Sequence, residues 1–167
     1  MWNKKTISKS EVEALTSKYR MDALTASILL RRGITEGKEL LYFLEDDLRF
    51  QHSPFSFNAM EDAVDRILEA KEENEKVLIF GDRDVDGVTA TTVLYECLVS
   101  MGIDVRYRLP KGDDAYGLSI QAVDDFEKEY GSLIITVDCG ISNFTEIEYA
   151  VSKGMDVIVT DHHNPPE

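Results

Sequence analysis

The chain has 167 residues, of which 43% are hydrophobic and 30% are charged. This length and composition suit an ordinary folded α/β domain and exclude a disordered or low-complexity chain. No run of about 18 apolar residues occurs, which excludes a membrane-spanning helix, and no apolar segment follows Lys4 and Lys5 as a signal peptide would require. Because Cys97 and Cys139 lack the spacing of a metal knuckle, we expect reduced core cysteines in a cytoplasmic protein with no membrane partner.

The net charge is −14, from 32 acidic and 18 basic residues. Taken alone, this balance argues against a nucleic-acid-binding protein, whose phosphate contacts need Lys and Arg. Metal-dependent phosphoryl enzymes are an exception, because their acidic clusters bind the cations that in turn hold phosphate. The charge therefore leaves a nucleic-acid substrate open only if the acids are gathered into a metal site.

Residues 1–57 have the pattern of a helical N-terminal lead-in. Ser10 and Glu13 have the spacing of a capping box, which predicts that the first helix begins after Ser10. A second apolar-periodic helix spans residues 22–32 and is expected to end at Gly33.

From residue 58 the pattern alternates between helices and strands, which predicts a second region, 58–167. Asn58 is the expected N-cap of a long helix. The strands that follow are short continuous apolar runs, which is typical of strands buried on both faces of a parallel sheet. We therefore expect an α/β fold with a doubly wound, mainly parallel sheet flanked by helices. The expected strands are 76–81, 103–108, 132–137 and 155–160, and the expected helices are 87–101, 119–130 and 143–153.

Acidic and imidazole side chains follow three of these strands. Asp82, Asp84 and Asp86 follow the first, Asp138 follows the third, and the triplet at 161–163 follows the fourth. Because ligands bind at the carboxyl ends of the strands in open parallel sheets, we expect these three turns to converge on one edge.

Such a cluster needs a cation. Two carboxylates about 4 Å apart repel each other by about 4 kcal/mol at an effective dielectric constant near 20, and a divalent ion removes that repulsion. His162 and His163 add imidazole, which with carboxylate suits Mn²⁺, Fe²⁺ or Zn²⁺. Asp138 is placed to bridge two metal ions, the arrangement that activates water for in-line phosphoryl displacement.

Two simpler interpretations compete for the first turn. Asp-rich turns between a strand and a helix often only cap the helix. The spacing also resembles part of an EF-hand loop, but that loop would need a Glu at its twelfth position and would not follow a strand. Neither interpretation explains why the other two strands also end in acidic or imidazole residues.

The combined motifs resemble those of the DHH phosphoesterase superfamily, and in finer detail the RecJ-like exonucleases. The match covers nearly the whole chain, from LLRRGI at 29–34 onward, and includes GDRDVDGVTATTVL at 81–94, AYGLS at 115–119, VDCGIS at 137–142 and VTDHHNPPE at 159–167. The resemblance implies a two-metal phosphodiesterase that degrades single-stranded DNA from 5′ to 3′ with Mn²⁺ or Mg²⁺. It also suggests a single-strand-binding protein or a helicase as a partner.

The resemblance also implies a set of site residues. Asp82 is expected either to bind metal or to support a ligand, and His163 either to bind metal or to face phosphate. Lys111, Tyr116 and Arg83 are the expected substrate contacts. The expected catalytic and metal-binding residues are Asp84, Asp86, Asp138, His162 and His163, with Asp82 as an additional metal ligand.

The sequence departs from the family pattern near the substrate. Lys111 and Gly112 stand where the family usually has Asn and Arg, Ala115 replaces a Gly, and Arg83 stands where an aromatic residue is common. These changes affect the expected grip on substrate more than the metal chemistry.

The family contributes a further metal-binding Asp and two further domains downstream of the last motif. We therefore expect a DHH domain that is truncated at its C-terminal end, and an isolated chain with little activity of its own. Two other functions stay open: a phosphodiesterase for short oligonucleotides or cyclic dinucleotides, and a non-catalytic nucleic-acid-binding scaffold.

Overall fold

A computed structural model describes residues 4–166 and divides the chain into two units, Met1–Ser56 and Phe57–Glu167. The first unit is helical. Its apolar core is formed by residues from all three of its α-helices and the turn after the second: Leu15, Ala26, Leu29, Leu30, Ile34 and Leu40. Its elements are α1 (Lys9–Tyr19), α2 (Ala23–Arg32), α3 (Gly37–Leu44) and two short 3₁₀ turns, Leu48–Phe50 and Pro54–Ser56.

The caps of these helices differ in part from the sequence predictions. The capping box of α1 is formed by Ser8 and Glu11, two residues earlier than the predicted pair Ser10 and Glu13. Both pairs have the same three-residue spacing, so the sequence pattern alone does not choose between them. Gly33 ends α2 in the left-handed conformation as predicted, and its N–H reaches Leu30 O at 3.1 Å.

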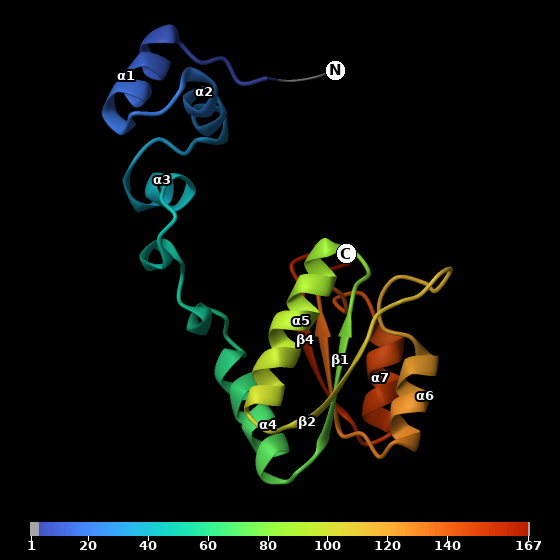
Figure 1. The fold of residues 1–167 in the computed structure, drawn as a ribbon. Helices are drawn as coiled ribbons and strands as arrows, with labels where there is room; N and C mark the ends of the chain where they lie inside the picture. The colour runs from blue at the N-terminus through green and yellow to red at the C-terminus, as the bar shows by residue number, and fades with distance from the viewer. Residues whose placement is uncertain (1–3, 167) are drawn as a thin grey trace. The chain divides into compact units, whose positions relative to one another are not determined.

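The second unit is a four-stranded parallel sheet covered by helices on both faces (Figure 1). The predicted doubly wound parallel sheet is therefore confirmed. The strand order is β2-β1-β3-β4. Strand β2 therefore lies on one side of β1, and β3 lies on the other. The elements are α4 (Met60–Glu72), β1 (Lys76–Gly81), α5 (Val85–Ser100), β2 (Asp104–Arg108), α6 (Ile120–Lys128), β3 (Leu133–Val137), α7 (Phe144–Ser152) and β4 (Asp156–Thr160).

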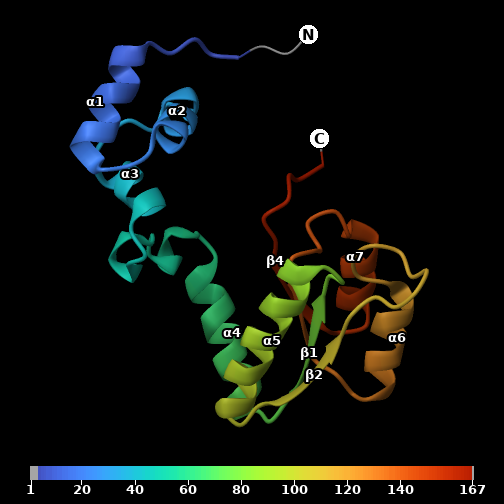
Figure 2. The same cartoon turned by 45° about the horizontal axis from the view of Figure 1, so that its top comes forward.

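Alternation along the strands assigns side chains to the two faces of the sheet. Val77 and Ile79 of β1 pack with α5 and with Ala70 of α4, whereas Leu78 and Phe80 pack with α6 and α7. Figure 2 shows the same arrangement, with α4 and α5 on one side of the sheet and α6 and α7 on the other. Burial on both faces explains why β1 and β3 are continuous apolar runs in the sequence.

Three further local predictions were wrong. Helix α4 begins after Ala59 without a side-chain cap, so Asn58 is not its N-cap. Helix α5 begins at Val85, two residues earlier than expected, because Asp84 caps it. Cys97 is exposed, whereas Cys139 is buried as expected. Among residues 4–166, no helix combines the length and the apolar character needed to cross a bilayer.

Candidate metal centre

The turn after β1 brings Asp82 and Asp84 to the carboxyl end of the sheet. The Oδ1 atom of Asp84 accepts a hydrogen bond from Gly87 N at 3.0 Å, and this bond lowers the pKa of the Asp84 carboxyl. Asp82 is buried, and its Oδ1 has no hydrogen-bond partner among the described residues. The cap therefore favours the ionised form of Asp84, while Asp82 holds a buried oxygen that a bound cation would satisfy.

Asp138 follows β3, one strand over from Asp82. Its backbone lies in the left-handed region, at φ 59°, and its N–H donates to Thr160 O at 2.9 Å, which ties the turn after β3 to the end of β4. The side chain is only 6% exposed, and its Oδ1 lies 3.0 Å from His162 Nε2 without a well-aligned hydrogen bond. Burial first, and then the nearby Asp84 carboxylate, raise the pKa of Asp138. The ionised form of a buried carboxylate beside a second one is unfavourable, and a bound cation would relieve that cost.

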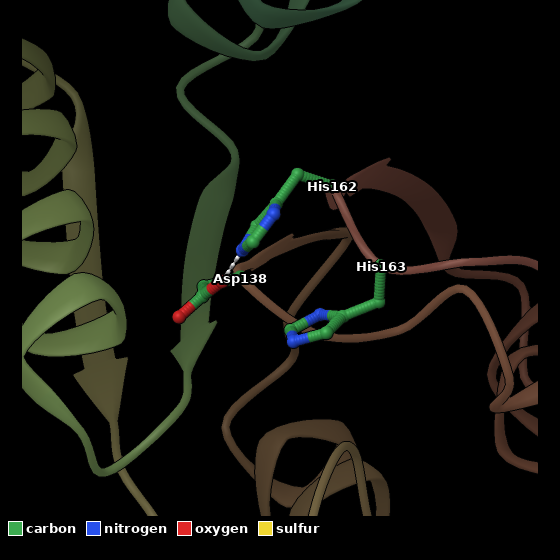
Figure 3. Close-up of side chains that lie close together, drawn as sticks. All are labelled: Asp138, His162 and His163. Atoms are coloured by element: carbon green, nitrogen blue, oxygen red, sulfur yellow. Dashed lines mark ion pairs between the residues drawn. The ribbon is translucent and has the colours of Figure 1, made fainter. Parts of the chain in front are cut away.

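The three residues after β4, Asp161, His162 and His163, make different contacts. His162 points to Asp138, as Figure 3 shows, and its side chain is exposed. The side chain of Asp161 is 1% exposed and belongs to neither set of possible ligand atoms, and its Oδ1 atom lies 2.7 Å from His163 Nδ1. That hydrogen bond raises the pKa of His163. Burial acts to raise the pKa of Asp161, but hydrogen bonds from the backbone N–H groups of His163 and Ile141 outweigh it and lower that pKa.

Two sets of ligand atoms result, and they share Asp138. Asp82, Asp84 and Asp138 form one, and Asp138, His162 and His163 form the other; within each set the ligand atoms lie within 4.8 Å of one another. A carboxylate shared by an all-oxygen set and an imidazole-rich set is the geometry expected for two neighbouring divalent ions. The strand order explains it, because β1 and β3 are neighbours at the point where the chain reverses direction across the sheet.

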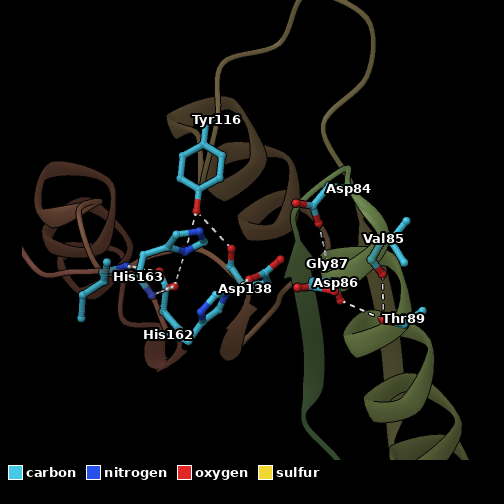
Figure 4. A network of polar contacts seen from close by, with 11 residues as sticks. Asp84, Val85, Asp86, Gly87, Thr89, Tyr116, Asp138, His162 and His163 are labelled. Atoms are coloured by element: carbon cyan, nitrogen blue, oxygen red, sulfur yellow. Dashed lines mark hydrogen bonds and ion pairs between the residues drawn. The ribbon is translucent and has the colours of Figure 1, made fainter. Parts of the chain in front are cut away.

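Asp86 lies outside both sets. It occupies the first turn of α5 and lines a depression of about 290 Å³ together with Asp138 and His162. Its charge contributes to the raised pKa of Asp138. Its role as a metal ligand stays a prediction, and Figure 4 shows it on the same side of the site as Asp84.

The three expected substrate contacts lie on or against the loop between β2 and α6. Tyr116 Oη donates to Asp138 O at 3.1 Å and lies 3.2 Å from His163 Nδ1 (Figure 4). The Arg83 guanidinium is bound to loop carbonyl oxygens, at Gly112 and Asp114. Lys111 is exposed on the same loop. Burial and the surrounding carboxylates raise the pKa of Tyr116 to about 12, so its hydroxyl stays protonated.

Two residues outside the expected set of catalytic, metal-binding and substrate-binding residues support the site. Asp161 positions His163, and its Oδ2 accepts from Ile141 N at 3.0 Å. Asn143 bonds both the N–H and the carbonyl of Leu118, at 3.1 and 3.2 Å. Asp161 belongs to the DHH triplet and was visible as such, whereas nothing in the sequence pattern indicated Asn143.

A larger cavity lies away from these ligand sets. It has a volume of about 850 Å³, lies between α4 and the edge strand β4, and is mainly apolar. Of the side chains that carry the ligand sets, it contains none. The possible ligand atoms lie instead at the carboxyl edge of the sheet, beside the shallower depression.

The fold and the site define the class: an open α/β sheet with a cluster of carboxylates and imidazoles at its carboxyl edge, suited to a pair of divalent cations. A family model described as the DHH family, N-terminal domain, matches residues 76–167. The chain therefore belongs to the DHH family.

The curated relatives are similar over most of the chain. The single-stranded-DNA-specific exonuclease RecJ of Bacillus subtilis is 36% identical over 165 residues, which is 98% of this chain and 21% of that protein. The protein of the same name from Escherichia coli is 36% identical over 80% of this chain and 23% of its own length. The chain thus spans about a fifth of the length of the curated relatives it matches.

Solved structures agree in fold. A crystal structure of exonuclease RecJ bound to manganese is 34% identical, with a TM-score of 0.61 over 66% of this chain and 29% of that one. RecJ of Thermus thermophilus in complex with Mn²⁺ is 26% identical, with a TM-score of 0.68 over 95% of this chain and 22% of that one.

Proposed function

We propose that this chain is the metal-binding front part of a metal-dependent phosphodiesterase, an exonuclease that acts on single-stranded DNA from 5′ to 3′. The observation that carries the proposal is the buried Asp138 shared by two ligand sets. The names of the relatives, single-stranded-DNA-specific exonuclease RecJ, support the substrate. In this proposal residues 1–57 are a helical lead-in and residues 58–167 are part of the DHH domain.

The residues present fit a pair of divalent ions, Mn²⁺ or Mg²⁺. The Oδ1 atoms of Asp82 and Asp138 are buried without hydrogen-bond partners in residues 4–166, and cations would satisfy both. Asp82 and Asp84 would hold one ion, His162 the other, and Asp138 would hold both. Asp86 is a further candidate ligand on the rim of the same depression. Bound ions would supply an activated water and would neutralise charge on the phosphate.

The protein's own groups can then orient the substrate. His163 is held at Nδ1 by Asp161, which leaves Nε2 as its second polar atom, and its pKa is raised. In its protonated form, an imidazole beside the metal site is suited to bind a phosphate oxygen. Lys111 lies on the neighbouring loop and is the proposed second phosphate contact, and Tyr116 offers an aromatic face on which a base can stack.

The proposal extends to the setting of the protein. We propose a cytoplasmic role in DNA repair and recombination, with a helicase or a single-strand-binding protein as partner. The free state of both cysteines supports a reducing compartment. The chain has 32 acidic and 18 basic residues. This excess of acids supports a role in metal binding for residues 1–167, with the DNA backbone bound by other parts of the protein.

The test is Mn²⁺-dependent digestion of 5′-labelled single-stranded and double-stranded DNA by the full-length protein. Asp138→Asn removes the shared ligand, and Asp104→Asn, a half-exposed carboxylate on β2, is the matched control. Single strands should be shortened from the 5′ end by the wild type and the control, and not by Asp138→Asn. Cleavage of short oligonucleotides alone would move the assignment to small substrates, and Mn²⁺ binding without any cleavage would favour a scaffold.

A further inference from the structure

One loop segment touches all three turns that carry the metal-site residues. This segment, residues 111–116, is called the strap below, and it lies between β2 and α6. Its first contact is with Arg83, which stands between Asp82 and Asp84 in the turn after β1. The guanidinium of Arg83 donates from Nη1 to Gly112 O at 2.8 Å and from Nη2 to Asp114 O.

The strap contains a turn that is held by its own hydrogen bonds, so it can act as a rigid connection between the two sides of the site. Asp114 Oδ2 accepts from Lys111 N at 2.9 Å, and Asp114 N donates to Lys111 O at 3.0 Å. Gly112 adopts a positive φ of 55° in this turn, which suits a residue without a Cβ. The two carbonyls that Arg83 binds therefore belong to one hydrogen-bonded turn rather than to a free chain.

The far end of the strap is fixed to the other side of the site. Tyr116 Oη donates to Asp138 O at 3.1 Å, in the turn after β3, and lies 3.2 Å from Nδ1 of His163, which follows β4. Just beyond the strap, Leu118 is bonded at both its N–H and its carbonyl by Asn143. The strap thus joins the turn that carries Asp82 and Asp84 to the turns that carry Asp138 and His163.

We infer that Arg83 is a positioning residue: through the strap, it fixes the distance between the carboxylates after β1 and the ligands after β3 and β4. The inference rests on the proposed metal site and adds a role for a residue that the sequence placed in contact with substrate. The inference follows from the hydrogen-bond partners of the Arg83 guanidinium. Although carboxylates flank Arg83 on both sides in the sequence, its donors in the described structure go to strap carbonyls.

The physical need for such a tie is repulsion across the site. Asp84 and Asp138 stand on different turns, and their carboxylate oxygens lie within 4.8 Å of each other. Before metal binds, that repulsion favours separation of the two turns. Two hydrogen bonds from a cation at one end of the strap and the Tyr116 hydroxyl at the other oppose it, so that the ligand atoms are held at binding distance in advance.

The test measures Mn²⁺ affinity of the full-length protein by titration calorimetry, in Arg83→Ala, Tyr116→Phe and the double variant. We expect each single variant to weaken Mn²⁺ binding by about 10-fold, as for residues that orient metal ligands without touching the metal. Because both act through one strap, the double variant should be little weaker than the worse single variant, instead of multiplying the two losses. Arg106→Ala and Tyr130→Phe, which change exposed residues outside the strap, are the controls.

Hydrogen exchange in the metal-free protein separates a local tie from general unfolding. In Arg83→Ala the amides of Lys111 and Asp114 should exchange faster, while the amides of the β1–β3 ladder keep their protection. Equal Mn²⁺ affinity in wild type and Arg83→Ala, multiplicative losses in the double variant, or unchanged exchange in the strap would each overturn the inference. Failure of the wild type to bind Mn²⁺ would instead overturn the proposed function, and the inference with it.

Discussion

Asp161 holds His163 twice through the same oxygen: Oδ1 accepts from His163 N at 3.0 Å and lies 2.7 Å from His163 Nδ1. The first residue of the DHH triplet is therefore the anchor of the third. One contact holds the backbone of His163 and the other holds its ring at Nδ1, so rotation of the ring would break the second contact. The imidazole is thus presented to the site in one orientation, with Nδ1 as the donor to the Asp161 carboxylate.

Asp161→Asn should lower the pKa of His163 toward its ordinary value, because an amide oxygen accepts the same hydrogen bond without the charge. The substitution should also cost about 1–3 kcal/mol of stability, since Oδ2 accepts from Ile141 N and an amide NH₂ in that place leaves this donor unpaired. The measurement is an NMR titration of the His163 ring in metal-free protein. A His163 pKa that stays raised in the variant would contradict the anchoring role.

The same pair predicts a pH window for the metal-free protein. The pKa of Asp161 is lowered on folding, so its contribution is present above the ordinary value near 3.9 and is lost as the pH falls through the lowered one. The pKa of His163 is raised, so its contribution is present below about 6.5 and is lost as the pH rises through the raised value. Urea unfolding in the presence of a chelator should show the stability difference between wild type and His163→Ala greatest between these ordinary values. A difference that keeps growing above neutral pH would contradict the assignment.

In the metal-free protein, ionisation of Asp138 should lower the stability of the fold, whereas ionisation of Asp161 raises it. The pKa of Asp138 is raised by burial and by Asp84, so the ionised form destabilises the metal-free fold, and the penalty grows as the pH rises. Asp138→Asn should therefore stabilise the chelator-treated protein at pH 7, by on the order of 1 kcal/mol, while it abolishes stabilisation by Mn²⁺.

Thermal unfolding with chelator and with excess Mn²⁺ checks this reversal. Asp104→Asn, on the exposed part of β2, should follow the wild type in both conditions. If Asp138→Asn were less stable than the wild type even without metal, the carboxylate would have to be satisfied by protein groups, and its role as a shared ligand would be lost.

The sequence predicted the arrangement of strands well because burial on both faces leaves a strong local signal. The runs at Val77–Phe80 and Leu133–Val137 are apolar apart from Thr136, and an acid is the first residue after each of the three strands that end at the site. Convergence of the three turns then followed from the rule that parallel strands present their carboxyl ends at one edge.

Partners of individual side chains were less predictable, because they depend on contacts between segments far apart in the chain. Asp82, expected as the least certain ligand, joins a ligand set, whereas Asp86 does not. Arg83 is bound 29 and 31 residues away, at Gly112 and Asp114, and no spacing rule links those positions. The shift of the α1 cap from Ser10 to Ser8 has a different cause, because two serines with a Glu three residues later compete locally.

Gly87→Ala tests whether the turn after β1 sets the metal geometry. Gly87 lies in the first turn of α5, where alanine would ordinarily favour a helix by about 1 kcal/mol. Here a Cβ would come within 2.4 Å of Asp82 O and 2.6 Å of Asp82 N, so the backbone that carries Asp82 has to move. We expect Mn²⁺ affinity to fall by about 10-fold or more, as for misplaced ligands.

Gly102→Ala is the control, because its positive φ of 83° makes alanine strained while open space surrounds the site of the Cβ. It should lower the free energy of unfolding by about 1 kcal/mol and leave Mn²⁺ affinity unchanged. Calorimetric titration of both variants separates loss of stability from loss of geometry. If Gly87→Ala bound Mn²⁺ as tightly as the wild type, Asp82 would not be a ligand, and the all-oxygen set would reduce to Asp84 and Asp138.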